Sequence, residues 1–218
     1  MQVVIAGGHG KIALILERML AARGDSVAGI VRNPAHVGDL ETAGATPLIL
    51  DLEKASVDEV AAQLGGADAV VFAAGAGPGS GAARKDTVDR DAAILLADAA
   101  QAAGVRRYVM ISAMAADPHA TADDEVFQVY LRAKGVADEA IRSRTALDWT
   151  IVRPGALTDE PATGRVTVAE STGRGSIPRE DVAALLVAVL DEPRTAGQRF
   201  DLISGDTPIA DAVAALAR

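Results

Sequence analysis

Short apolar runs alternate with amphipathic stretches along the first two thirds of the chain. The runs are rich in Val, Ile, Leu and Ala and are bounded by Gly, Pro or polar residues, which is typical of buried parallel strands. The predicted strands cover residues 3–6, 26–31, 46–50, 67–74, 107–112 and 148–152. Between them, apolar residues three and four positions apart predict helices. These helices cover residues 12–20, 56–64, 87–103 and 126–144, and a short helix follows residue 34. The acidic run 123–125 is expected to begin the helix over 126–144.

Strands that alternate with helices at this spacing predict βαβ units. The expected fold class is α/β, a doubly wound parallel sheet with helices on both faces. Right-handed crossovers then bring the carboxyl ends of the strands to one edge of the sheet, where such folds bind ligands. The residues expected at that edge are Gly7, Arg32, Asp51, Gly75, Ser112 and Pro154.

The last third of the chain is less regular. Its apolar patterns predict strands over 164–169 and 198–203 and helices over 182–190 and 209–217. Ser176 is expected to cap the first of these helices, with Pro178 in its first turn. No repeat or long linker interrupts the sequence, so we expect residues 1–218 to form a single domain. Residues 155–218 are expected to add a small elaboration on the substrate side.

The first predicted strand ends at a glycine-rich turn. Gly7 and Gly10 are three residues apart, and Ala13 stands where a small residue lets a helix pack closely on the strand. A strand, a tight turn and a helix in this order can place backbone N–H groups around a pyrophosphate. The spacing predicts a dinucleotide site, and the alternative is a purely structural turn.

Polar residues end the second and third strands, where the adenosine of a dinucleotide would lie. Folds that bind NAD usually have Asp or Glu after the second strand, whereas this chain has Arg32. A guanidinium suits the 2′-phosphate of NADP, and Lys11 is expected to add a second positive charge. Asp51 and Leu52 can bracket an adenine ring. The alternatives are solvated cations at Arg32 and Lys11, and a helix cap at Asp51.

Tyr130 and Lys134 share one face of the helix predicted after the fifth strand. A phenol has an ordinary pKa of about 10, and a nearby ammonium is expected to lower that pKa. The phenol would then donate a proton to a carbonyl oxygen, with Lys134 as its modulator. Ser112 either polarises the substrate carbonyl or only caps the strand end. For Tyr130 and Lys134 the alternative is an amphipathic surface pair.

Composition narrows the choice of partners and compartment. The net charge is −9 and no long basic cluster occurs, so neither nucleic acid nor an anionic membrane is an expected partner. The sequence shows no cysteine, no leader and no apolar stretch long enough to span a membrane, so we expect a cytoplasmic protein. Its expected partner is a small-molecule substrate. We expect it to be a monomer or a homodimer. His9, His36 and His119 lack metal-binding spacing and are expected to be ordinary surface residues, with no metal.

The motifs together resemble a known superfamily. The chain is similar to the short-chain dehydrogenases/reductases, and most of all to the compact atypical members with an NAD(P)H-binding, NmrA-like domain. That group includes the biliverdin reductase B-type flavin reductases. The resemblance spans nearly the whole chain and rests on the segments 7–13, 73–77, 105–112, 130–134, 148–155 and 176–183. It implies a Rossmann fold and a nicotinamide cofactor.

The resemblance also implies roles for individual residues. It implies that Gly7, Gly10 and Ile12 contact the pyrophosphate of the cofactor and that Arg32 contacts the 2′-phosphate. It also implies that Ala73, Ala74 and Gly75 line the ribose and nicotinamide. Pro154 to Leu157 would lie along the nicotinamide and substrate. Tyr130 and Lys134 match the active-site pair of the family. The family's Ser or Thr usually lies just beyond Ser112, where this chain has Ala113 and Met114.

The sequence therefore predicts an NADPH-dependent oxidoreductase that transfers hydride to a small carbonyl, quinone or flavin-type substrate. One alternative is a catalytically silent regulator that senses NADP(H), because several atypical members have lost the full catalytic set. Another is a biosynthetic member of the superfamily, such as an epimerase or an oxygenase-like enzyme acting on a polyketide.

Overall fold

A central nine-stranded sheet organises the protein, whose computed structural model describes residues 1–77, 79–121 and 126–217. From one edge to the other the order is β11-β8-β10-β6-β5-β4-β1-β2-β3. The strands are β1 Gln2–Ala6, β2 Ser26–Val31, β3 Thr46–Ile49, β4 Ala69–Phe72, β5 Arg107–Ile111, β6 Asp148–Pro154, β8 Arg165–Ala169, β10 Gln198–Ser204 and β11 Thr207–Pro208. The run from β3 to β10 is parallel, and β8 and β11 extend it with antiparallel pairs.

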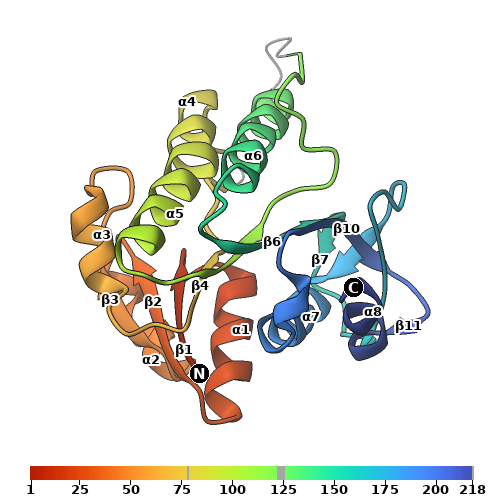
Figure 1. Cartoon of the computed structure of the whole chain (residues 1–218), viewed down its shortest axis with the longest axis horizontal. Helices are drawn as coiled ribbons and strands as arrows, with labels where there is room; N and C mark the ends of the chain where they lie inside the picture. The colour runs from red at the N-terminus through yellow and green to blue at the C-terminus, as the bar shows by residue number, and fades with distance from the viewer. Residues whose placement is uncertain (78, 122–125, 218) are drawn as a thin grey trace.

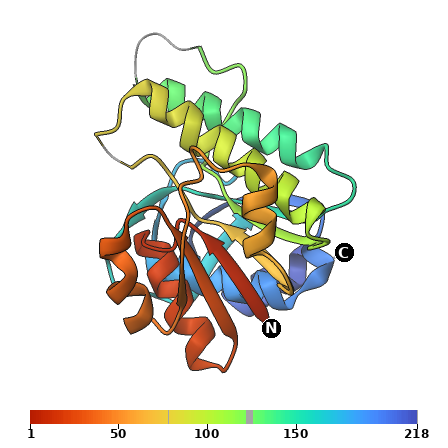
Figure 2. The same cartoon turned by 90° about the vertical axis from the view of Figure 1, so that its left-hand side faces the viewer.

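Helices cover both faces of this sheet (Figure 1). One face is packed by α1 Lys11–Ala22, α2 Val37–Thr42, α7 Arg179–Asp191 and α8 Ile209–Leu216. The other is packed by α3 Val57–Gln63, α5 Ala92–Ala102 and α6 Val126–Arg142. Figure 2 shows that α5 and α6 lie side by side above the sheet. The predicted doubly wound α/β class is confirmed.

Alternation along each strand explains why two apolar layers form. Val3 and Ile5 of β1 enter the core beneath α1, whereas Val4 and Ala6 enter the core beneath α5. Successive strand side chains point to opposite faces, so an uninterrupted apolar run suits a strand that is covered on both sides. With few aromatic residues, the two layers are filled mainly by Ala, Val, Leu and Ile.

The segment after β4 differs from the single helix predicted over 87–103. It begins as the short α4 Ala82–Arg84, continues as a π-helical stretch Lys85–Asp91, and returns to α-helical geometry in α5. A π-turn holds an extra residue, which changes the direction of the side chains around it. Here that stretch turns Lys85, Val88 and Asp89 into the protein interior.

The carboxyl-terminal third also differs from prediction at its first helix. Ser176–Pro178 forms the short strand β9, which pairs in parallel with β7 Ala156–Thr158, and α7 starts only at Arg179. The predicted Ser176 cap and the first-turn position of Pro178 are therefore wrong, because both residues belong to a strand. β6 also continues through Pro154, two residues beyond the predicted end. The acidic run 123–125 lies outside the described residues.

No helix in the described part of the chain combines the length and the apolar character that crossing a bilayer requires.

Candidate cofactor and active site

The glycine turn between β1 and α1 has the backbone geometry of a phosphate site. Gly7 has φ +83°, and a Cβ built there would lie 2.6 Å from Ala74 Cα, so only glycine fits. The N–H groups of Gly7 and Gly8 both donate to the Ile30 carbonyl, each at 3.1 Å. Gly10 caps α1 without a side-chain hydrogen bond, which leaves the first N–H groups of the helix for a ligand. These residues fit a dinucleotide pyrophosphate.

A cavity of about 270 Å³ opens beside this turn at the carboxyl edge of the sheet. Eight of the predicted cofactor residues line it: Gly7, Gly10, Arg32, Asp51, Leu52, Ala73, Ala74 and Gly75. Lys11, Ile12 and Pro154 do not. Ile12 is 8% exposed and packs in the core beneath α1, while Pro154 is buried in β6 and its carbonyl accepts from Met114 N at 3.0 Å. Their predicted contacts with the cofactor stay predictions.

Lys11 does not line the cavity and pairs with a carboxylate far along the chain. Its Nζ lies 2.6 Å from Asp159 Oδ2, and Arg179 binds the other oxygen of the same carboxylate at 2.6 Å. Asp159 follows β7, so this contact joins the start of α1 to the carboxyl-terminal third of the chain. The expectation that Lys11 would add a second charge beside Arg32 is wrong in this arrangement, because Lys11 has a distant carboxylate partner.

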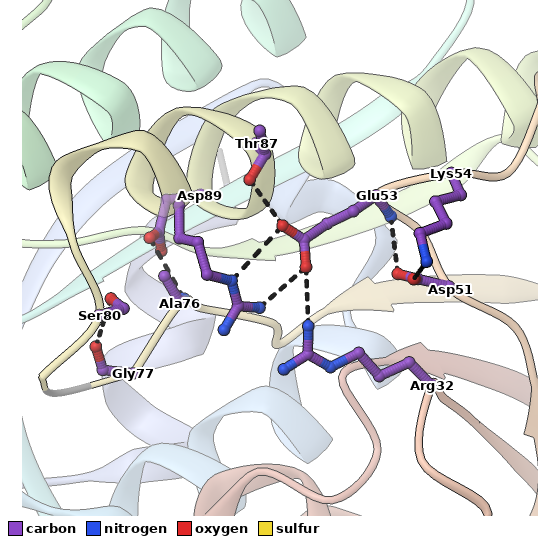
Figure 3. A network of polar contacts seen from close by, with 10 residues as sticks. Arg32, Asp51, Glu53, Lys54, Ala76, Gly77, Ser80, Thr87 and Asp89 are labelled. Carbon is purple, nitrogen blue, oxygen red and sulfur yellow. Dashed lines mark hydrogen bonds and ion pairs between the residues drawn. The ribbon is translucent and has the colours of Figure 1, made fainter.

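Arg84 supplies the second positive charge near Arg32 instead. Arg32 Nη1 and Arg84 Nη2 each lie 2.9 Å from Glu53 Oε2, and Thr87 Oγ1 donates to Glu53 Oε1 at 2.7 Å. Figure 3 shows the Glu53 carboxylate between Arg32 and Thr87. Burial alone would raise the pKa of Glu53, but the hydrogen bonds from Thr87 and Arg84 outweigh it and hold that pKa below its ordinary value. Arg32, Arg84 and Glu53 all line the cavity.

Asp51 has a local structural role as well as a place in the cavity wall. Its Oδ1 accepts from Glu53 N at 3.1 Å, and its Oδ2 lies 3.5 Å from Lys54 Nζ. It does not cap the next helix, because Ser56 forms a complete capping box with Glu59 at the start of α3. The Asp51 side chain therefore shapes the turn that presents Leu52 and Glu53 to the cavity.

Two histidines lie at the cavity, contrary to the expectation of ordinary surface residues. The rings of His9 and His36 stack with centroids 3.5 Å apart, and both residues line the cavity. His9 Nε2 is 2.8 Å from Asp39 Oδ2. Among the described residues, no group of three or more His, Cys, Asp or Glu could hold a metal ion.

Lys134 of α6 is buried rather than part of a surface pair. It is 3% exposed, its Nζ lies 3.3 Å from Asp89 Oδ1, and it donates to the Ile111 carbonyl at 3.2 Å. The ammonium also lies 5.2 Å from the centre of the Phe72 ring. It is thus fixed at the carboxyl ends of β4 and β5, next to the glycine-rich segment.

Tyr130 lies one helical turn before Lys134, with Lys85 Nζ 5.3 Å from the centre of its ring. Burial raises the pKa of the phenol, and the carboxylates of Asp89 and Asp138 raise it further. The expected lowering by Lys134 is therefore wrong in this arrangement, because that ammonium is paired with Asp89. The phenol keeps its proton at neutral pH.

Ser112 lies at the end of β5 beside a second buried ion pair. Asp138 Oδ2 is 3.2 Å from Arg153 Nε, and both side chains are almost fully buried. Burial raises the pKa of Asp138 to about 6, while Ser112, Arg153 and Lys134 hold it lower than burial alone would. In the described part of the chain, Ser112 Oγ makes no hydrogen bond of normal geometry, although it lies near that carboxylate. The hydroxyl does not cap the strand end.

Sequence reasoning missed Glu53, Arg84, Asp89 and Asp138 as members of the site. Position gave a usable signal for two of them, because Glu53 directly follows Asp51-Leu52 at a strand end and Arg84 follows the glycine-rich loop after β4. Asp89 and Asp138 gave no local signal. Each is an acidic residue in a helical segment, where a solvated position is the ordinary expectation.

The parallel sheet, the glycine turn and the cavity beside it define a dinucleotide-binding Rossmann protein. The model of the NAD(P)H-binding family matches residues 7–193, and the chain belongs to this family. This confirms the resemblance to atypical short-chain dehydrogenases/reductases and supports a nicotinamide cofactor.

Relatives share both the sequence and the fold over nearly their full length. The uncharacterized sugar epimerase YhfK of Bacillus subtilis is 39% identical over 98% of this chain and 99% of its own. A structure from Bacillus halodurans, provisionally assigned as an NAD-dependent epimerase/dehydratase, is 36% identical with a TM-score of 0.90 and covers 99% of each chain. The oxidoreductase YlbE of Lactococcus lactis is 27% identical with a TM-score of 0.87 over 99% of this chain and 96% of its own.

Proposed function

We propose that the protein is an NADPH-dependent oxidoreductase that reduces a small carbonyl, quinone or flavin-type substrate. The observation that carries this proposal is the position of Tyr130 on α6, one helical turn before buried Lys134, whose ammonium lies at the carboxyl ends of β4 and β5. A phenol that keeps its proton at neutral pH is suited to donate it. Reduction of a carbonyl requires such a proton donor at the oxygen.

NADPH, when bound, supplies the hydride, and the chain supplies the proton and the orientation. In carbonyl reduction the C=O π bond breaks as the carbon gains hydride, and Tyr130 would protonate the oxygen to give the alcohol. Lys134 stays paired with Asp89 at 3.3 Å, so it fixes the part of α6 that carries Tyr130 rather than lowering the pKa of the phenol. The Ser112 hydroxyl is positioned near Asp138 and orients the substrate oxygen.

The preference for NADPH over NADH rests on the arginines of the cavity. Arg32 directly follows β2, where NAD-binding folds usually hold the ribose 2′-hydroxyl with an acid, and its guanidinium suits a 2′-phosphate. Arg32→Ala should weaken NADPH binding about tenfold or more while changing NADH binding little. Equal losses for the two cofactors would contradict a 2′-phosphate contact.

The test of the activity is oxidation of NADPH in the presence of a panel of aldehydes, quinones and flavins. Tyr130→Phe should lower turnover at least ~100-fold with unchanged NADPH affinity, because it removes only the proton donor. Tyr108→Phe is the matched control, since that hydroxyl donates to the Ala93 carbonyl in the core, away from the cavity. Unchanged turnover of Tyr130→Phe would refute the assigned role.

An epimerase is the second candidate, favoured by the names of the Bacillus relatives. Epimerisation through a transient oxidation needs Tyr130 first as a base, whereas its raised pKa favours the protonated form. An epimerase would invert a sugar stereocentre with no net NADPH consumption. Tight NADPH binding with neither turnover nor inversion would instead favour a nucleotide-sensing regulator.

A further inference from the structure

Two arginines from distant parts of the chain converge on one oxygen atom in the cavity. Arg32 directly follows β2 and Arg84 ends α4, yet both donate to Glu53 Oε2 at 2.9 Å (Figure 3 shows the Arg32 contact). Thr87 holds the other oxygen of the carboxylate at 2.7 Å. An oxygen that accepts from two guanidinium groups has the surroundings of a phosphate oxygen in an arginine-lined site.

The charges of this cluster do not balance. Two guanidinium groups face one carboxylate, which leaves the cluster with an excess positive charge at the adenosine end of the cavity. The Arg32 and Arg84 side chains are 53% and 38% exposed, whereas Glu53 is 20% exposed. The arginines can therefore be reached from the cavity by an anion, and the carboxylate lies behind them.

We propose that Arg84 joins Arg32 in binding the 2′-phosphate of NADP(H), and that Glu53 is an internal competitor for both arginines. In this proposal the carboxylate holds the guanidinium groups together in the free protein. The 2′-phosphate takes over these hydrogen bonds on binding, and its repulsion of Glu53 lowers the affinity. The inference rests on the NADP(H) preference proposed above and identifies two more residues that set it.

The experiment compares 2′,5′-ADP with 5′-AMP by isothermal titration, because these two ligands differ only in the 2′-phosphate. Arg84→Ala should weaken 2′,5′-ADP binding about tenfold or more and 5′-AMP binding less than about twofold. Arg90→Ala is the matched control, since Arg90 lies on the same segment but pairs with Asp86 and Asp91 outside the cavity. It should leave both affinities unchanged.

Glu53→Gln tests the competition directly. Glutamine keeps the shape and can still accept from Thr87, but it lacks the charge that repels a phosphate. Binding of 2′,5′-ADP should become about two- to fivefold tighter, with 5′-AMP binding unchanged. Weaker binding of 2′,5′-ADP would overturn the competition and show that Glu53 only orders the arginines. Equal changes for both ligands would place Glu53 against the adenosine itself and overturn the proposal too.

The failure of this inference can be told apart from the failure of the NADP(H) preference. If Arg32→Ala does not separate 2′,5′-ADP from 5′-AMP, the preference itself is wrong. If Arg32→Ala separates them but Arg84→Ala does not, only the role of Arg84 falls. Thermal melting of each variant checks its folding. Should Arg84→Ala unfold, Arg84→Gln keeps much of the side-chain volume and has the same expected outcome.

Discussion

Glu17 of α1 predicts an unusual dependence of stability on pH. The residue is fully buried, and within the described residues neither carboxylate oxygen has a hydrogen-bond partner. Its Oε1 lies against the backbone of the glycine region, so that a Cβ built on Gly29 or Gly8 would lie 2.6 or 2.9 Å away. Burial raises the pKa of Glu17 from its ordinary 4.5 to about 8, and Arg18 offsets this only in part.

The sign of the effect follows from proton linkage. The folded state binds the Glu17 proton more tightly than the unfolded state, so the free energy of unfolding falls as pH rises between 4.5 and about 8. Below that window the residue is protonated in both states, and above it in neither. The slope is ~1.4 kcal/mol per pH unit, which gives a loss of ~3 kcal/mol at pH 7.

Glu17→Gln isolates this contribution, because glutamine is nearly isosteric and neutral at every pH. Urea unfolding of both proteins at pH 5, 6, 7 and 8 gives the difference in free energy of unfolding. That difference should move in favour of Glu17→Gln by ~1.4 kcal/mol per unit and level off above pH 8. A buried amide adds a constant cost that leaves the slope unchanged. Glu41→Gln, an exposed control on α2, should show no slope. A flat difference for Glu17→Gln would refute the reasoning.

Two further predictions concern buried charges. Arg107→Met removes a guanidinium that donates to four acceptors, three of them in buried hydrogen bonds, and should lower the free energy of unfolding by ~3–5 kcal/mol in urea. Exposed Arg106→Met should change it by less than ~1 kcal/mol, and equal losses would contradict this account. Asp89→Asn removes the carboxylate beside Lys134, which should lower kcat and shift the basic limb of the pH–rate profile to lower pH. Asp86→Asn should leave that profile unchanged.

The order of strands and helices could be predicted from the sequence because the patterns that indicate a strand, a turn or a helix are local. Apolar runs, glycine at a turn with positive φ and proline at a helix start act within a few residues. Parallel topology then carried Gly7, Arg32 and Ala74 to one edge without knowledge of any contact. The same locality explains the errors at Ser176 and Pro178, where a three-residue strand depends on its pairing with β7.

The electrostatics of the site were decided by tertiary structure. Lys11 finds its carboxylate 148 positions away, and Lys134 finds Asp89 only because the π-helical stretch turns that residue inward. A charged residue looks the same in sequence whether it is solvated or buried with a partner. The fold chooses between these states, because removing a charge from water is tolerated only where an opposite charge or hydrogen-bond donors meet it. The sequence by itself therefore determined where a dinucleotide can bind, and the packed structure decided which charges face it.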